Sequence, residues 1–409
     1  MEALSVCVVG AGMAGLSALK NSLQSNLNAT CFEQSTHLGG TWFYQEEQDA
    51  AFGENVHSSM YRDLRTNLPK EIMGYLDFTY SKQSKESFIS SDEVLKFLNS
   101  YADHFHLREH IKFQHKVLVS HNISRRCKQH LFDRVFVCNG HYTKPQYPKT
   151  VGMSCYKGIQ MHSHLYRTQD KFKGEKVLII GAGPSGIDLT NHISKVANCV
   201  YLSHHLSKKP NTDFMRNVIQ KPNVKQFIET GAIFEDNSTE EFDIVVYCTG
   251  YQYSFPFLSS ECGIFVHNNH VQPLYKHCIN VNYPTMAIIG LPYAVIPSQV
   301  FDLQVRFSLK FFKNELKLPS REDMLTELKK DNEDRKKDGL RERDAHKMGA
   351  KQFCYYKDLS KTANLIGVKP VIEKIMQDCG QKYIYELQTY REYYFQVLDD
   401  ENFIKLPLK

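Results

Sequence analysis

The sequence contains no pair of cysteines at a spacing typical of a redox centre or a metal site. Its eleven cysteines are scattered, without C-x-x-C or Cys/His ligand spacing. Several lie in apolar, strand-like runs, as Cys7, Cys138 and Cys248 do. Reduced, buried thiols in an intracellular protein are the simplest interpretation. The pattern therefore predicts neither a disulfide framework nor a metal centre.

Long hydrophobic runs and a strong excess of charge are missing as well. No stretch approaches the roughly 18–20 apolar residues of a membrane-spanning helix, and the first predicted strand begins at Leu4, which leaves no room for a signal peptide. The formal net charge is only +5 over 409 residues, without a strong basic block. We therefore expect a soluble, cytoplasmic protein with no integral membrane segment and no nucleic-acid partner. Peripheral association with the endoplasmic reticulum stays open.

The dinucleotide fingerprint G-x-G-x-x-G, in contrast, occurs twice in the chain. Each copy follows a short apolar, β-prone run, at 4–9 and at 176–180, and opens a helix-forming stretch. Such glycines let a strand turn tightly and let the backbone approach a pyrophosphate, which the following helix N-terminus binds. Two copies predict two nucleotide cofactors with electron transfer between them. The residues are Gly10, Ala11, Gly12, Met13, Ala14 and Gly15 in the first copy, and Gly181, Gly183, Pro184, Ser185 and Gly186 in the second.

The residue that ends the next strand assigns a cofactor to the first fingerprint. A strand predicted at 29–32 ends in Glu33. A carboxylate at this position can accept hydrogen bonds from both hydroxyls of an unphosphorylated adenosine ribose. We therefore predict that the first site binds FAD.

The second fingerprint is followed by a different set of side chains. The corresponding strand ends in Ser203, with His205 and Lys208 just beyond, and no carboxylate stands there. Hydroxyl, imidazole and ammonium groups suit a 2′-phosphate, so the second site is predicted to bind NADPH. The alternative interpretation of these residues is a solvated basic loop.

A repeated strand pattern predicts the domain organisation. Buried strands expected at 133–138 and 243–248 follow the two fingerprints in the same way. The fold class is therefore predicted as α/β, with two dinucleotide-binding, Rossmann-like domains. We expect a discontinuous FAD-binding domain of residues 1–168 and 252–409, with an NADPH-binding domain of residues 169–251 inserted into it.

Several further elements are expected from periodicity and composition. An amphipathic helix is predicted at 91–101 with Ser91 or Asp92 as N-cap, and a second helix at 300–312. The densely charged stretch 320–351 predicts a solvent-exposed helical surface. The aromatic C-terminal residues are expected to pack against the FAD-binding domain.

One segment is shorter than folds of this kind lead us to expect. A three-stranded meander usually precedes the strand at 133–138, but only residues 116–131 are available for it, and three strands of about five or six residues with turns need more. A hairpin or a splicing truncation would fit, and either would weaken FAD retention. A second meander, at 224–241, is predicted to be intact, with a turn at Asp236-Asn237.

The chain closely resembles the flavin-containing monooxygenases, particularly the shorter insect forms, over nearly its whole length. The most specific match is to the signature F-x-G-x-x-x-H-x-x-x-[FY], represented by Tyr156, Gly158, His162 and Tyr166. Tyr156 replaces Phe, and Tyr166 stands where the related Baeyer–Villiger enzymes usually carry Trp. The resemblance implies a hinge between domains beside the nicotinamide. If this stretch is helical, His162 and Tyr166 share a face, and ordinary helix packing is the alternative.

The resemblance also implies roles for individual residues. Asn67 corresponds to the family's active-site asparagine near the reactive edge of the flavin, with Thr66 beside it on the NADPH side. Asn67 by itself would be interpreted as a turn residue before Pro69. Gln304 corresponds to a position close to the flavin, and a solvent-facing helix residue is its alternative. The small residues of the segment Gly40, Thr41 and Trp42 permit close approach to FAD.

The implied activity is NADPH- and O₂-dependent N- or S-oxygenation of soft nucleophiles, such as tertiary amines, alkaloids and thioethers, through a flavin hydroperoxide, an N,N-dimethylaniline-type monooxygenase. A neutral amide at Asn67 can hydrogen-bond that intermediate without protonating it, and a dry site protects it. An NADPH oxidase that releases hydrogen peroxide, or a defective flavoprotein, are the alternatives. The physiological substrate and the formation of a homodimer stay open.

Overall fold

The computed structural model of the chain describes residues 3–46, 57–81, 83–118, 128–206 and 211–408. Its larger unit is built on a seven-stranded sheet in the order β17-β18-β19-β4-β1-β2-β3. The strands from β19 to β3 are parallel, and β17, β18 and β19 pair antiparallel. The bounds are β1 Ser5–Val9, β2 Asn28–Phe32, β3 Ile111–Lys112, β4 Arg134–Val137, β17 Leu274–Tyr275, β18 Ile279–Asn280 and β19 Met286–Ile288.

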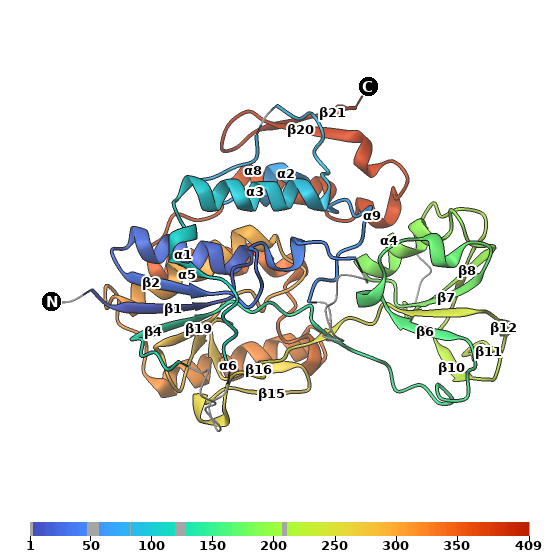
Figure 1. Cartoon of the computed structure of the whole chain (residues 1–409), viewed down its shortest axis with the longest axis horizontal. Coiled ribbons are helices and arrows are strands. Elements are labelled where there is room, and N and C mark those ends of the chain that lie inside the picture. Colours follow the sequence, from blue (N-terminus) through green and yellow to red (C-terminus); the bar gives the residue numbers. More distant parts are fainter. Residues whose placement is uncertain (1–2, 47–56, 82, 119–127, 207–210, 409) are drawn as a thin grey trace.

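Helix α1 (Met13–Gln24) is the central helix of this unit. Every residue from Met13 to Ser22 is buried, because the helix lies over the sheet, beside α5 (Pro297–Phe312) and below α3 (Ser91–His104) (Figure 1). Its Asn21 side chain donates to the Asp302 carboxylate of α5 at 3.0 Å. α7 (Gln352–Ala363) packs on the far side of α5.

The C-terminal elements form an additional layer over this unit. In Figure 1 the strands of the C-terminal hairpin and helix α8 lie above α1 and α5, next to α3 and α2. Phe395 is buried against Phe88, as the sequence predicted for the C-terminal aromatics. The bounds are α2 Lys70–Met73, α8 Pro370–Cys379, α9 Lys382–Tyr385, β20 Tyr393–Val397 and β21 Phe403–Pro407, with β15 Phe265–His267 and β16 His270–Gln272 on the opposite side of the sheet.

The smaller unit contains a five-stranded parallel sheet in the order β6-β13-β7-β8-β9. Strand β6 comes from residues before 169, so the sheet begins upstream of the predicted boundary, and the exact domain limits stay a prediction. A three-stranded antiparallel meander covers this unit, with the predicted turn at Asp236-Asn237. The bounds are β6 Ile159–His162, β7 Lys176–Ile180, α4 Pro184–Ile193, β8 Cys199–Ser203, β9 Val218–Lys221, β10 Val224–Phe227, β11 Gly231–Phe234, β12 Thr239–Glu241 and β13 Ile244–Tyr247.

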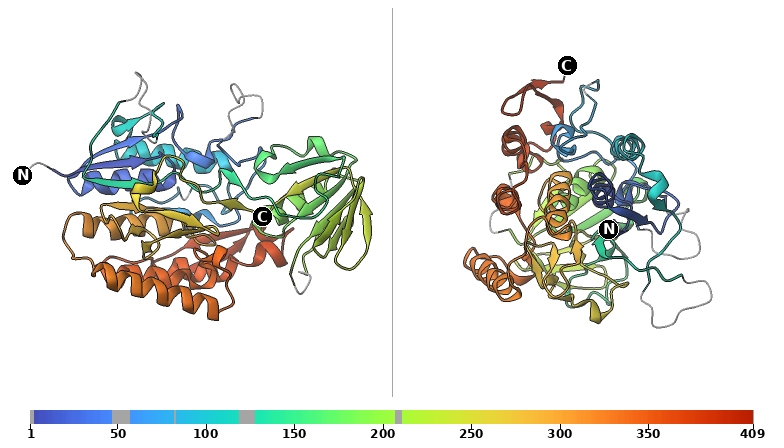
Figure 2. Two further views of the ribbon diagram at one scale, coloured as in Figure 1. Left: turned by 90° about the horizontal axis from the view of Figure 1, so that it is seen from below. Right: turned by 90° about the vertical axis from the view of Figure 1, so that its left-hand side faces the viewer.

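A two-stranded ribbon joins the two units. β5 (Lys144–Pro145), which follows β4, pairs antiparallel with β14 (Tyr251–Gln252), which follows β13. The carboxyl ends of both parallel sheets therefore lead into the same ribbon. Figure 2 shows the smaller unit at one end of the elongated molecule.

Two local predictions need correction or completion. The N-cap of α3 is Ser90, one residue before the predicted cap, because Ser90 and Glu93 form a reciprocal capping box. In the short segment 116–131, the described residues 116–118 and 128–131 form no strand, and the proposed hairpin falls on residues outside the described ranges.

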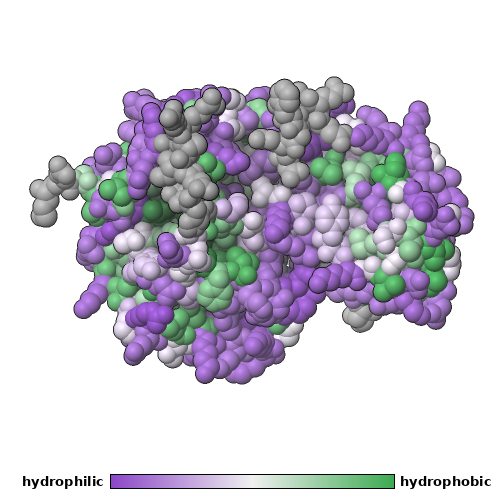
Figure 3. Space-filling model, turned by 60° about the horizontal axis from the view of Figure 1, so that its bottom comes forward, coloured by the Kyte–Doolittle hydropathy of each residue, from purple (hydrophilic) through white to green (hydrophobic). Residues whose placement is uncertain are grey.

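Among the described residues, no helix is long and apolar enough to cross a membrane. Figure 3 shows hydrophilic side chains over much of one face, with apolar ones in separate groups.

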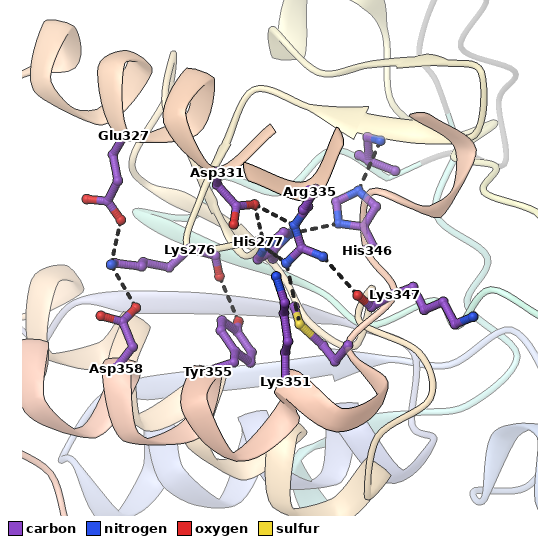
Figure 4. Close-up of polar contacts among 12 residues, drawn as sticks. Lys276, His277, Glu327, Asp331, Arg335, His346, Lys347, Lys351, Tyr355 and Asp358 are labelled. Carbon is purple, nitrogen blue, oxygen red and sulfur yellow. Dashed lines mark hydrogen bonds and ion pairs between the residues drawn. The ribbon is translucent and has the colours of Figure 1, made fainter. Parts of the chain in front are cut away.

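The charged segment that follows residue 320 is only partly a solvent-exposed surface. Helix α6 (Arg321–Lys337) is exposed along most of its length, but Arg335 is buried. Its guanidinium contacts the Asp331 carboxylate at 2.6 Å, the Lys347 carbonyl at 2.8 Å and His277 at 3.1 Å (Figure 4). His277 in turn contacts His346 at 3.1 Å, and burial lowers the pKa of both imidazoles. This cluster is satisfied by its own members and fastens α6 to the sheet.

Replacement of Arg335 by alanine is expected to lower the free energy of unfolding by about 2–3 kcal/mol, because it removes the charge partner of Asp331 and the contacts to the Lys347 carbonyl and to His277. Lys337→Ala is the matched control, since this side chain lies on the same helix but is 74% exposed, and its loss should change stability by less than about 0.5 kcal/mol. Urea denaturation compares the variants. Equal effects of the two substitutions would contradict an anchoring role for Arg335.

Candidate functional site

The first fingerprint forms a turn in which backbone atoms pack too closely for side chains. Gly10 has φ +99°, and a Cβ on Gly15 would lie 1.7 Å from the Gly10 carbonyl oxygen. Gly12 is the N-cap of α1 and has no side-chain cap, so the amide groups of the first helical turn stay available to an anion. The cradle therefore fits a pyrophosphate.

The segment from Gly39 onward closes over this turn. The Gly39 amide donates to the Ala11 carbonyl at 3.0 Å, and a Cβ on Gly40 would lie 3.1 Å from the Gly12 Cα. Thr41 and Trp42 follow and are half-buried. The structure thus brings the predicted FAD-binding residues from both segments together.

Glu33 lies at the carboxyl end of β2, as predicted. Its carboxylate is buried and accepts hydrogen bonds from the Ala11 amide at 2.7 Å and from the Ser35 amide and hydroxyl at 2.8 Å. These contacts hold the charge against the fingerprint turn, use both lone pairs of Oε1 and leave one lone pair on Oε2. The ribose contact stays a prediction that this geometry accommodates.

The second fingerprint repeats the geometry of the first. Gly181 has φ +107°, and a Cβ on Gly186 would lie 1.8 Å from the Gly181 carbonyl oxygen. Among the described residues, no atom other than those of its chain neighbours lies within 4 Å of a Cβ placed on Gly183, the N-cap of α4. Pro184 occupies the first helical turn and Ser185 is exposed. This cradle is open, as a site for a second pyrophosphate requires.

The residues predicted to bind the 2′-phosphate are only partly described. Ser203 is buried at the end of β8, and its hydroxyl donates to the Pro222 carbonyl at 2.8 Å. His205 is exposed, and Lys208 lies outside the described residues. The preference for NADPH at this position therefore stays a prediction.

The family signature adopts strand β6 followed by a short 3-10 turn at Ser163–Leu165, and not the α-helix on which a shared face of His162 and Tyr166 depended. The stretch pairs with β13 instead, and His162 ends strand β6. Its Nδ1 accepts the His164 amide at 3.1 Å, so its proton lies on Nε2, which donates to the Gly250 carbonyl at 3.0 Å. Burial lowers the pKa of His162 to about 4, so a neutral imidazole holds the ribbon between the units.

The three other signature positions have packing roles. The Tyr156 hydroxyl donates to the Phe242 carbonyl at 2.8 Å, a contact that the usual Phe cannot make. A Cβ on Gly158 would lie 2.2 Å from that hydroxyl, so this glycine makes room for the ring. Tyr166 is buried and meets the ring of Tyr61 edge-on at 5.2 Å. The signature thus connects the smaller unit to the segment that leads to Asn67.

Thr66 and Asn67 lie directly before helix α2. The buried Thr66 accepts the Ile89 amide at its hydroxyl, at 3.1 Å, and donates its own amide to the Ile89 carbonyl at 2.8 Å. Asn67 is exposed in the bend that follows. A fixed residue therefore precedes the predicted catalytic amide, whose contact with flavin stays a prediction.

Gln304 is fully buried in α5, so the alternative of a solvent-facing residue is wrong. Its Oε1 accepts the Gly290 amide at 2.9 Å, and its Nε2 donates to the Tyr355 hydroxyl at 2.8 Å. These contacts join β19, α5 and α7. Gln304 shapes the edge of the sheet beside the first cradle, and a direct flavin contact stays a prediction.

Sequence reasoning missed three residues between the two cradles, Tyr61, Asp188 and Arg391. Asp188 lies in α4 and takes contacts from both other side chains. Only the position of Asp188 shortly after the second fingerprint was a usable signal, because Arg391 is separated from it by 203 residues. Among the described residues no group of three or more His, Cys, Asp or Glu could hold a metal ion.

Substitution of one close-packed glycine at a time is expected to impair the binding of one cofactor and leave the other bound. Gly15→Ala should abolish FAD retention, because the new Cβ meets the Gly10 carbonyl. Gly186→Ala should leave FAD bound and weaken NADPH binding at least about tenfold, or 1.4 kcal/mol. Flavin absorbance of the purified proteins and an NADPH titration measure the two effects. Full FAD content in the Gly15 variant would disprove this assignment of the first cradle.

Acidification is expected to destabilise the fold as the pH falls from about 6.5 toward 4, because unfolded histidine binds a proton that the buried, neutral His162 resists. His162→Gln should lower the slope of unfolding free energy against pH by at most about 1.4 kcal/mol per pH unit. Replacement of the exposed His104 is the control. Urea denaturation at several pH values gives the slopes, and an unchanged slope in the His162 variant would contradict its neutral state.

Comparison with known proteins identifies the family. A family model described as flavin-binding monooxygenase-like matches residues 3–208 and 205–382. Senecionine N-oxygenase of Tyria jacobaeae is 34% identical, over 99% of this chain and 92% of that protein. Flavin-containing monooxygenase FMO GS-OX5 of Arabidopsis thaliana is 33% identical, over 99% and 94%. The structure of S-allyl-L-cysteine S-oxygenase from Allium sativum superimposes with a TM-score of 0.88 at 26% identity, covering 96% of both chains.

These matches confirm the predicted resemblance and the α/β fold with two dinucleotide-binding units. The family model is described as flavin-binding, and a solved steroid monooxygenase of similar fold is bound to NADP, in keeping with the FAD and NADP(H) predicted for the two cradles. The two glycine cradles, each at the carboxyl end of a parallel sheet, fit these two dinucleotides. The chain belongs to the flavin-binding monooxygenase-like family.

Proposed function

We propose that this protein uses NADPH and O₂ to N- or S-oxygenate soft nucleophilic substrates, namely tertiary amines, alkaloids or thioethers, an N,N-dimethylaniline-type activity. The observation that carries the proposal is the pair of glycine cradles, whose parallel sheets both lead into one ribbon. The relatives named for senecionine N-oxygenation and S-allyl-L-cysteine S-oxygenation support this substrate class. Bound FAD, reduced by NADPH, supplies the electrons that activate O₂.

The residues of the chain bind, orient and shield. The fingerprint helices α1 and α4 offer amide groups to two pyrophosphates. Thr66 fixes the start of the bend that carries Asn67, and the amide of Asn67 can donate a hydrogen bond without giving up a proton. A soft nitrogen or sulfur nucleophile needs no general base to react.

The proposal also covers the partners of the protein and its compartment. The substrate and O₂ are the expected small-molecule partners, and the cytoplasm is the expected compartment. A homodimer is compatible with this proposal and is not required by it. An NADPH oxidase that releases hydrogen peroxide is the competing function, to be distinguished by experiment.

Asn67→Asp is expected to retain FAD and abolish oxygenated product, because a carboxylate accepts hydrogen bonds where the amide donates one. Asn28→Asp is the matched control, since Asn28 is exposed at the opposite end of β2 from the cradle. Flavin absorbance, N-oxide yield from a tertiary amine and NADPH consumption are measured together. An N-oxide yield in the Asn67 variant equal to that of the wild type would disprove the catalytic role of Asn67. Hydrogen peroxide without oxygenated product in the wild type would favour the NADPH oxidase.

A further inference from the structure

Asp188 carries a largely buried charge on the helix that starts at the second fingerprint. It lies two residues after Gly186 in α4, and its side chain is only 15% exposed. The Tyr61 hydroxyl donates to Oδ2, and Arg391 Nη2 lies 3.2 Å from Oδ1. Tyr61 belongs to the larger unit and Arg391 to the C-terminal layer, so three parts of the molecule meet at one carboxylate.

Arg391 connects this carboxylate to the segment that carries the predicted catalytic amide. Its Nη2 also donates to the Arg65 carbonyl at 3.0 Å, and its Nε donates to the Thr66 carbonyl at 3.2 Å. The guanidinium lies over the Tyr390 ring, 4.7 Å from its centroid. The Arg391 side chain therefore contacts α4 and the two residues directly before Asn67.

Tyr61 adds a second connection, to the family signature. Burial and the charge of Asp188 raise the pKa of Tyr61 well above its usual range, so the hydroxyl keeps its proton and remains a donor. The Tyr61 ring packs edge-on against Tyr166 at 5.2 Å and against His192 at 5.5 Å. Burial lowers the pKa of His192, which leaves Arg391 as the cation that balances Asp188.

The C-terminal segment also contacts α4 independently of charge. The Gln388 side chain donates to the Asn191 side chain at 2.9 Å and to the Asp213 carbonyl at 3.2 Å. Residues 388 and 391 thus hold α4 at two points along its length. Since a helix of ten residues is a stiff rod of about 15 Å, a shift at Asp188 moves the N-terminus of α4 by a similar amount.

We propose that Asp188 and Arg391 are positioning residues that fix Asn67 relative to the second dinucleotide site. The inference rests on the proposed function for its catalytic consequence, although the contacts themselves involve only residues of this chain. When the nicotinamide end of NADPH and the Asn67 amide are correctly spaced, the electrons of NADPH are used to oxygenate the substrate. Loss of the spacing diverts them to hydrogen peroxide, because a displacement of about 1 Å can lower the rate of a positioned reaction 100-fold.

The test uses conservative variants of both residues in the FAD-loaded, full-length protein. Asp188→Asn keeps the shape and removes the charge, and Arg391→Lys keeps the charge but cannot reach one carboxylate and two carbonyls together. Arg62→Gln is the matched control, because Arg62 adjoins Tyr61 but pairs with Glu46 at the surface, with side chains 52% and 48% exposed. Product and hydrogen peroxide are measured per NADPH consumed with a tertiary amine as substrate.

Both variants are expected to retain FAD and to give about 10-fold to 100-fold less product per NADPH, with a matching rise in peroxide. The double variant Asp188→Asn/Arg391→Lys should be no worse than the poorer single variant, since the two residues act as a unit. Unchanged product per NADPH in both single variants would overturn the proposal. So would effects that multiply in the double variant, because they would show independent roles.

Hydrogen exchange separates this inference from the proposed function. Amides in the peptide that spans residues 61–68 should exchange faster in the Asp188 and Arg391 variants than in wild type, and not in the Arg62 control. If the wild type gives only peroxide, the proposed function fails, yet faster exchange would still support the positioning role. Unchanged exchange in this peptide would overturn the positioning role whatever the product. Arg391→Lys serves for this measurement if Asp188→Asn fails to fold.

Discussion

The contact between a strand carbonyl and a glycine of the following helix is the constraint on which the rest of the structure depends. At Gly15 and Gly186 a side chain would meet the backbone less than 2 Å away, so each helix starts directly over its strand end. That position exposes the helix N-terminus at the carboxyl edge of the sheet, where ligands of open α/β sheets bind. Each fingerprint turn also packs closely on the residue that follows a neighbouring strand. Gly10 lies close to the Cys138 carbonyl after β4, and Gly181 lies close to the Cys248 carbonyl after β13.

Two equivalent cradles perform joint chemistry only if their edges face each other, and the ribbon between β5 and β14 imposes that arrangement. Strands β4 and β13 both run into this ribbon. His162 fastens it from the smaller unit through the Gly250 carbonyl, and Asn139 fastens it from the larger unit through the Ser254 carbonyl at 3.1 Å. The family signature is therefore a structural element of the interface, and its histidine acts as a neutral hydrogen-bond donor.

The sequence predicted what depends on local pattern, and it missed what depends on distant contacts. The glycine fingerprints and the helix of α5 follow from residues close in the chain, and they were predicted correctly. A shared face of His162 and Tyr166 required a helix in this stretch, but pairing with β13, over 80 residues away, makes His162 the end of a strand, and a 3-10 turn follows it. The buried Arg335 was missed because its neighbours Asp334 and Lys336 are ordinary surface charges. Asp188 and Arg391 meet only through the tertiary fold, and no periodicity connects them.

The differences between the two cradles distinguish a resident cofactor from one that must be exchanged. In the first, Met13 begins the helix with a free amide, Glu33 is held against the turn, and the Gly40 segment closes over it. In the second, Pro184 occupies the first turn and provides no amide, and the space beside Gly183 is open. Fewer backbone donors and an open approach weaken binding and speed release. These properties fit a dinucleotide that is consumed in each turnover, whereas the closed cradle fits one that stays.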